Sequence, residues 1–190
     1  MERRHFVGLL LAASMLAATG CSTTSGSKGS AADKRSAIDA SVDSALAKLY
    51  ASAKGSKELV AKSQGVLVFP SVLAAGLVVG GEYGEGALRT GGTSSGYYST
   101  AAVSVGLQAG AQSKAVIFFL FMTKDALNKF TASKGWTAGV DGSVALAKIG
   151  ANGDVDTSSV SAPVVGFVLT NAGLMANLNL EGTKVTKLDL

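Results

Sequence analysis

The stretch AVIFFLFM, residues 115–122, decides the fold class, because all eight of its side chains are apolar. A strand with one face in water alternates apolar and polar residues, whereas a strand covered on both faces is apolar throughout. The stretch therefore predicts a central strand in a sheet that has a layer of structure on each side.

A helical pattern precedes this strand. Apolar residues recur at spacings of three and four from Ile38 to Ala53, with polar residues between them, which is typical of an amphipathic helix. We expect Asp33 to cap this helix and Gly55 to end it. A second, short helix is expected over residues 56–62, with Ser56 as its cap.

Strands dominate the rest of the chain. Thr123 is expected to cap one internal helix that ends near Ser133. The other apolar runs predict strands, at residues 66–69 (ended by Pro70), 76–82, 87–90, 97–112, 140–149, 161–170 and 174–180. Asn152-Gly153 is a tight-hairpin signal between two of them. The fold class is α+β, with N-terminal amphipathic helices packed on a largely antiparallel, strongly curved β-sheet or partial barrel.

Glycine is concentrated in one part of the predicted sheet. Five glycines lie within residues 76–86, among them Gly84 and Gly86. Glycine weakens a strand and is kept where the backbone bends or another element approaches closely. We expect a glycine-rich bend here, with close packing as the reason for these residues.

The N-terminus resembles a bacterial lipoprotein signal. Arg3 and Arg4 precede an apolar stretch, residues 6–16, and small residues lead to Cys21, the only cysteine. The apolar stretch is shorter than the roughly 20 residues that span a bilayer. The expected organisation is a signal peptide at 1–20, a lipidated cysteine with a flexible Ser/Gly-rich tether at 21–32, and one domain at 33–190. The alternative is an ordinary secretory signal.

The expected mature chain lacks reactive side chains. His5, the only histidine, leaves with the signal, and Cys21 would carry lipid. Nucleophilic cysteine chemistry, histidine acid–base catalysis and soft metal sites are therefore excluded. We expect a protein that is not an enzyme and has no cofactor and no metal.

Positive charge gathers next to the expected anchor. Residues 21–64 hold seven basic and four acidic side chains, whereas residues 65–190 hold eight of each. Each Lys or Arg near an anionic membrane contributes on the order of 1 kcal/mol of attraction. This asymmetry favours docking on phospholipid headgroups; the alternative is a solvated helix face without a partner.

Other motifs give weaker signals. The run GGEYGEG, residues 80–86, fits neither phosphate-binding pattern, and residues 152–156 depart from a calcium loop at the required glycine and glutamate. The neutral body argues against nucleic acid. Glu82 and Glu85 stay open as paired carboxylates of a periplasmic hydrolase, provided that both line one cleft.

With these motifs in view, residues 36–188 resemble the SYLF domain, a lipid-binding module of the Ysc-type actin-binding family that also occurs in bacterial lipoproteins. The matching pieces are AKSQGVLVFP (61–70), AGLVVGG (75–81) with YGEG (83–86), GLQAGAQ (106–112) and GLMANLNLEG (173–182). Asn177 departs from the glycine that members often carry there.

The resemblance implies phospholipid binding, with basic residues near the N-terminal helix contributing. The positions corresponding to those residues here are Lys34, Arg35, Lys54, Lys57 and Lys62. Actin binding belongs to eukaryotic members and is not carried over to an exported bacterial protein. The resulting hypothesis is a lipoprotein on the periplasmic face of the outer membrane that binds anionic phospholipid; the alternative is an envelope structural or protein-interaction role.

Overall fold

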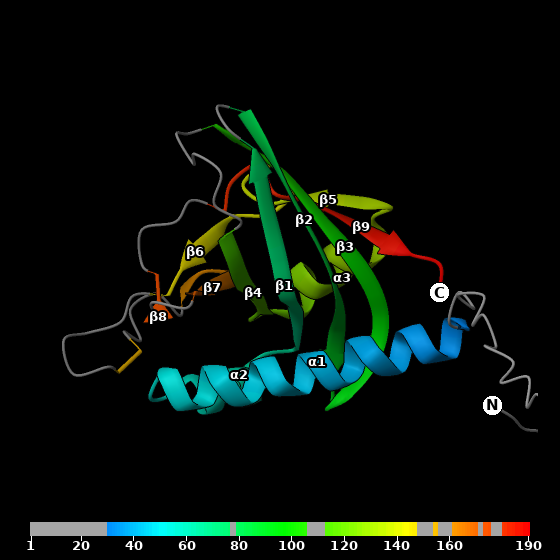
Figure 1. The fold of residues 1–190 in the computed structure, drawn as a ribbon. Coiled ribbons are helices and arrows are strands. Elements are labelled where there is room, and N and C mark those ends of the chain that lie inside the picture. The colour runs from blue at the N-terminus through cyan, green and yellow to red at the C-terminus, as the bar shows by residue number, and fades with distance from the viewer. Residues whose placement is uncertain are drawn as a thin grey trace, which may run out of the picture.

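The computed structural model describes residues 30–76, 79–105, 113–147, 154–155, 161–170, 173–175 and 180–190. These residues form three helices and nine strands (Figure 1). In chain order they are α1 (Ala31–Ser52), α2 (Ser56–Lys62), β1 (Gly65–Gly76), β2 (Val79–Thr90), β3 (Thr93–Val105), β4 (Ser113–Phe121), α3 (Lys124–Ala132), β5 (Gly135–Thr137), β6 (Val144–Leu146), β7 (Val164–Thr170), β8 (Gly173–Leu174) and β9 (Lys184–Leu188). None of the described helices has the length and apolarity needed to cross a bilayer.

The nine strands belong to one curled sheet. Their order is β5-β9-β3-β2-β1-β4-β7-β6, and β8 pairs with β7 outside this path. Neighbours are antiparallel except β6 and β7, which run parallel. Helix α1 crosses the outer face of the sheet, and α3 lies against the inner face (Figure 1). The predicted α+β class, with N-terminal helices on a curved and largely antiparallel sheet, is confirmed.

Strand β4 is the central strand that the stretch AVIFFLFM predicts. Ile117, Phe119 and Phe121 belong to the apolar core on the inner face. Phe118 and Leu120, which alternate with them, belong to the core on the outer face. All five side chains are at most 2% exposed. The strand is therefore covered on both faces, as predicted.

Aromatic rings fill the inner core. The ring of Phe130, on α3, lies 4.7 Å from that of Phe121 and 4.9 Å from that of Tyr98. Trp136, on β5, packs edge-on against Phe119 at 5.6 Å. These contacts hold α3 inside the curl of the sheet, against the edge strand β5, so the interior is packed with side chains.

The outer core joins α1 and α2 to the sheet. Ile38, Val42, Ala45 and Leu49 form the buried stripe of α1, as their spacing predicts. They pack with apolar residues of β1, β2, β4 and β7. Fully burying one such side chain contributes about 1.5–3 kcal/mol, so this stripe alone fixes α1 on the sheet.

The helix ends differ from the prediction. Ser30, not Asp33, caps α1: its hydroxyl accepts from the Asp33 N–H, and the Asp33 carboxylate accepts from the Ser30 N–H in return. In this capping box the N-cap residue is Ser30, and the acidic residue lies three positions further on, inside the helix. Asp33 therefore takes part in the cap but is not the N-cap residue that the sequence predicted. Gly55, at φ +84°, precedes α2 and serves as its N-cap, so Ser56 is the first helical residue.

Strand β1 continues through Pro70, where the sequence predicted its end. Proline has no N–H to donate to the ladder, and it is tolerated in a strand at a bulge. The register shifts between Val68 and Ser71 on the β2 side and between Phe69 and Val72 on the β4 side. A bulge thus absorbs Pro70 and lets β1 run to Gly76.

Strand β2 is also continuous, so the predicted glycine-rich bend is wrong. A side chain at Gly84 would lie 2.7 Å from the Ser71 carbonyl oxygen, and one at Gly86 would overlap the Val68 carbonyl oxygen. Both glycines therefore allow β2 to lie close against the bulge of β1. Close packing is confirmed as their role.

The remaining predicted strands are described only in part. Among the described residues 140–147, only residues 144–146 form a strand, β6, because residues 139–141 turn. The prediction over 161–170 corresponds to β7, and the prediction over 174–180 overlaps β8 at Leu174, while residues 176–179 lie outside the described residues. The prediction over 97–112 corresponds to β3, and the alternation at 106–112 lies outside the described residues.

Two strands were not predicted from the sequence, namely β5 and β9. The turn signal Asn152-Gly153 lies outside the described residues. Since β6 and β7 on either side are parallel, a tight hairpin does not join them.

Candidate functional site

The acidic residues in the middle of α1 face the sheet, where Arg89 of β2 meets them. The Arg89 Nη2 donates to Asp43 Oδ1 at 2.7 Å and to the Asp39 carbonyl at 3.2 Å. Asp39 also accepts from the Ser94 hydroxyl at 2.6 Å and from the Tyr97 hydroxyl at 2.9 Å. Burial first, and then the hydrogen bond to Asp39, raise the pKa of Tyr97. This network pairs two of the three acidic residues of α1, Asp39 and Asp43, with one guanidinium.

A cavity of about 340 Å³ lies beside this network, between α1, α2 and the β2–β3 turn. Its walls include Leu46, Tyr50, Val60 and the Arg89 side chain. Arg89 Nε is buried and has no hydrogen-bond partner among the described residues. The volume lies at the small end of the range for ligand pockets. The cavity combines apolar walls with one guanidinium whose charge is already paired.

A second polar contact fixes the N-terminal end of α1. The Lys34 Nζ donates to Glu85 Oε1 at 2.9 Å, and the Tyr83 hydroxyl donates to the same oxygen at 2.9 Å. Partial burial raises the pKa of Glu85. The hydrogen bonds from Lys34 and Tyr83 outweigh this effect and together hold the pKa below its ordinary value. Glu85 thus stays ionised and links α1 to β2.

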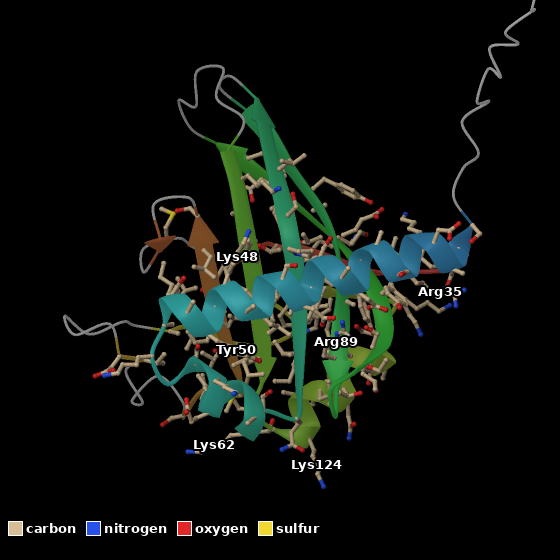
Figure 2. The ribbon with its side chains drawn as sticks, turned by 60° about the horizontal axis from the view of Figure 1, so that its bottom comes forward. Arg35, Lys48, Tyr50, Lys62, Arg89 and Lys124 are labelled. Carbon is tan, nitrogen blue, oxygen red and sulfur yellow. The ribbon has the colours of Figure 1, made fainter. Side chains whose placement is uncertain are left out.

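The five predicted basic residues do not form one cluster. Lys34 and Arg35 lie in the first turns of α1, Lys54 lies between α1 and α2, and Lys57 and Lys62 lie within α2. At 1.5 Å per residue, α1 separates the two groups by about 25 Å. Figure 2 shows Arg35 at one end of α1 and Lys62 on α2, below the other end of α1.

These residues also differ in their partners. Lys34 is paired with Glu85, and Lys54 lies 3.6 Å from Asp154 in an exposed ion pair. Arg35, Lys57 and Lys62 are exposed, and no ion pair joins them to another described residue. Lys48, on α1, is exposed in the same way (Figure 2).

The hydrolase hypothesis does not survive the geometry of β2. Glu82 and Glu85 are three residues apart in one strand, so their side chains leave opposite faces of the sheet. Glu85 is held by Lys34, and its side chain is 27% exposed. The two carboxylates therefore cannot line one cleft.

Arg89 is the main site residue that the sequence analysis missed. It is the only charged side chain in the stretch Gly86–Thr90. A charge inside an otherwise apolar strand is expensive unless it is paired. That signal could have indicated an acidic partner, but only the fold shows that Asp39 and Asp43 supply it.

Comparison with protein families agrees with the motifs of the sequence. Residues 101–189, just under half of the chain, match the family described as Las17-binding protein actin regulator, Ysc84. No curated protein sequence matches the chain. The matched range runs from the last part of β3 to just after β9 and includes two of the four quoted motifs, 106–112 and 173–182. Over residues 101–189 the chain therefore carries a domain of the Ysc84, or SYLF, family.

Proposed function

We propose that the protein is a membrane-anchored lipoprotein whose SYLF domain binds anionic phospholipid at the bacterial envelope and catalyses no reaction. The observation that carries this proposal is the sorting of charge on α1 and α2. Asp39 and Asp43 are paired with Arg89, whereas Arg35, Lys48, Lys57 and Lys62 are exposed and form no ion pair with another described residue.

The sorting leaves a positive outer surface. Residues 31–62 carry six basic side chains against four acidic ones, and two of those acids are engaged by Arg89. Each exposed cation near an anionic membrane contributes on the order of 1 kcal/mol, screened by salt over about 8–10 Å. The basic side chains of α1 and α2 are attracted to anionic headgroups and draw the domain toward the membrane, although they form two separate groups.

The proposed anchor lies at Cys21. An acylated Cys21 would join α1 through residues 22–30, which have the composition of a flexible tether. Stable membrane attachment needs two signals, such as two acyl chains or one chain with a basic patch. Here the acyl chains on Cys21 would be one signal and the basic side chains of α1 and α2 the other. Ser22 after the cysteine resembles the sorting pattern of outer-membrane lipoproteins.

Vesicle co-sedimentation tests the lipid-binding part. The chain from Ser22 to Leu190 keeps the cap Ser30 and every residue of both apolar cores, so it retains the described fold. We expect binding to vesicles containing phosphatidylglycerol, weaker binding in high salt, and little binding to phosphatidylcholine alone. Replacing Lys54, Lys57 and Lys62 by Gln should weaken the binding severalfold and flatten its salt dependence.

The matched control replaces Lys124, Lys129 and Lys134 by Gln, around α3 on the other face of the sheet. Equal losses for both triple variants would show only a dependence on net charge. Absence of binding at every lipid composition would overturn the proposal. The family description instead names the binding of a protein, so an envelope protein recovered by crosslinking, without lipid binding, would favour the protein-interaction alternative.

A further inference from the structure

A row of five side chains crosses the outer face of the sheet, in register across five neighbouring strands. The pairs along it are Lys184 of β9 with Ala101 of β3, Ala101 with Tyr83 of β2, Tyr83 with Leu73 of β1, and Leu73 with Lys114 of β4. Residues paired in register point to the same face of a sheet. These five residues are called the lysine-ended row below.

Two contacts place this row on the face that α1 crosses. Glu85, two residues after Tyr83, bonds to Lys34 of α1. Val116, two residues after Lys114, packs against the outer core. Residues two apart in a strand share a face. Strands β1, β2 and β3 extend beyond α1 here, so the helix leaves this part of the outer face uncovered (Figure 1).

The middle of the row exposes apolar surface. Leu73 is 50% exposed and Tyr83 is 53% exposed. Val103, two residues after Ala101 and on the same face, is 76% exposed. Ala101 is exposed as well. Exposed large apolar side chains that adjoin one another mark a binding surface more often than isolated ones do.

The two ends of the row are basic. Lys114 and Lys184 are exposed, and neither forms an ion pair with another described residue. Glu85, two residues from Tyr83 on the same face, is paired with Lys34. An apolar centre with a lysine at each end matches a phospholipid surface, where apolar groups enter the headgroup layer and ammonium groups meet phosphates.

We infer that the lysine-ended row, together with Val103 and the first turns of α1, is the surface that contacts the membrane. The inference rests on the proposed function and adds its contact surface. The position of the anchor supports it, because Lys34 is bound to Glu85 beside the row. Nine tether residues, 22–30, span about 16 Å, so an acylated Cys21 and the row reach one membrane together.

Site-specific fluorescence on the Ser22–Leu190 chain tests this surface. That chain has no cysteine, so Val103→Cys carries a single environment-sensitive dye, and Asn128→Cys on α3 provides the exposed control on the opposite face. With vesicles of phosphatidylethanolamine and phosphatidylglycerol, we expect a blue shift and quenching by lipid-borne quenchers at residue 103 only.

Charge and apolar variants provide a second readout. Lys114→Gln and Lys184→Gln should each weaken binding to these vesicles about fivefold, whereas Lys124→Gln, which removes the same charge at the start of α3 (Figure 2), should not. Leu73→Ser with Val103→Ser should weaken it about tenfold or more. All of the replaced side chains are exposed, so we expect these substitutions to leave the fold intact.

The outcomes separate the two proposals. If the chain binds vesicles but the dye at residue 103 is unmoved and the row variants bind normally, this inference is overturned and the proposed function stands. If nothing binds at any composition, both fail. If the dye shifts without vesicles as protein concentration rises, and sedimentation shows a dimer, a second copy covers the row and the membrane assignment is wrong.

Discussion

At Gly86, strand β2 lies against the bulge of β1, and a single methyl group would overlap the Val68 carbonyl oxygen. The obstacle is backbone on a strand buried between two neighbours, so it cannot rotate away. We expect Gly86→Ala to lower the free energy of unfolding by about 3 kcal/mol, the upper range for overpacking. Urea-induced unfolding of the Ser22–Leu190 chain measures this change.

Gly81 supplies the control for Gly86 within the same strand. A side chain there meets nothing within 4 Å, so Gly81→Ala should leave stability unchanged or raise it by about 0.5 kcal/mol through the lower entropy of the unfolded chain. Equal losses for both variants would mean that β2 needs glycine for its conformation and not for its contact with β1.

Individual side chains show where sequence reasoning stops. The burial of Phe118 between two layers follows from its neighbours in the chain, because a run without polar residues leaves no face for water. The pairing of Arg89 with Asp39 and Asp43 joins residues about fifty positions apart. No local pattern encodes such a distance, so only the folded arrangement reveals it.

At the scale of elements, Glu85 joins α1 to β2. Its pKa is lowered from the ordinary value of 4.5, so the folded protein binds this proton less readily than the unfolded chain does. The contact therefore stabilises the fold above pH 4.5, and this contribution is lost as the pH falls through the lowered pKa. We expect Glu85→Gln to be less stable than the natural chain at neutral pH and nearly equal to it in acid.

Urea unfolding at a series of pH values measures this difference. Glu82→Gln, the same change on the opposite face of the same strand, is the control, because no ion pair joins Glu82 to a described residue. A stability gap for Glu85→Gln that persists unchanged into acid would show that the carboxylate charge contributes nothing to the contact.

Long elements with a strong period were predictable, and short or irregular ones were not. The stripe from Ile38 to Leu49 fixed α1, and Thr123 correctly marked the start of α3. Strands β5 and β9 have three and five residues, and they exist because they pair with each other and because β9 pairs with β3. The predicted end of β1 at Pro70 and the predicted bend in β2 were both wrong. The bulge in β1 accommodates Pro70, and the glycines of β2 pack closely against that bulge.

The candidate site was predictable in its composition but not in its arrangement. The basic excess near the N-terminus is visible in the chain itself. The basic residues are divided between the two ends of α1 because the helix is long enough to separate them. The lysine-ended row depends on the register of five strands drawn from distant segments, and for that reason its residues showed no pattern in the sequence.

At the scale of the whole molecule, the proposed membrane attachment depends on one residue, Cys21. We expect the full chain, produced in a bacterium that acylates lipoproteins, to incorporate radioactive palmitate and to sediment with membranes. Cys21→Ser should abolish the labelling and move most of the protein out of the membrane fraction, because the basic surface alone binds reversibly. Ser25→Ala, in the expected tether, is the control and should behave like the natural chain.

Labelling that persists in Cys21→Ser would place the acyl group elsewhere and remove the proposed anchor. A Cys21→Ser protein that loses label but stays wholly membrane-bound would show that surface contacts suffice without acylation. In that case the domain's own binding surface would carry the localisation.

The curled sheet ends in β5 on one side and β6 on the other, each only three residues long. A sheet edge is a template on which another chain can add a strand, and short edges offer few free backbone groups for this. Proteins crowded on a two-dimensional surface meet one another far more often than they do in bulk solution. On the proposed membrane surface, brief edges would therefore limit strand addition between neighbouring copies of this domain.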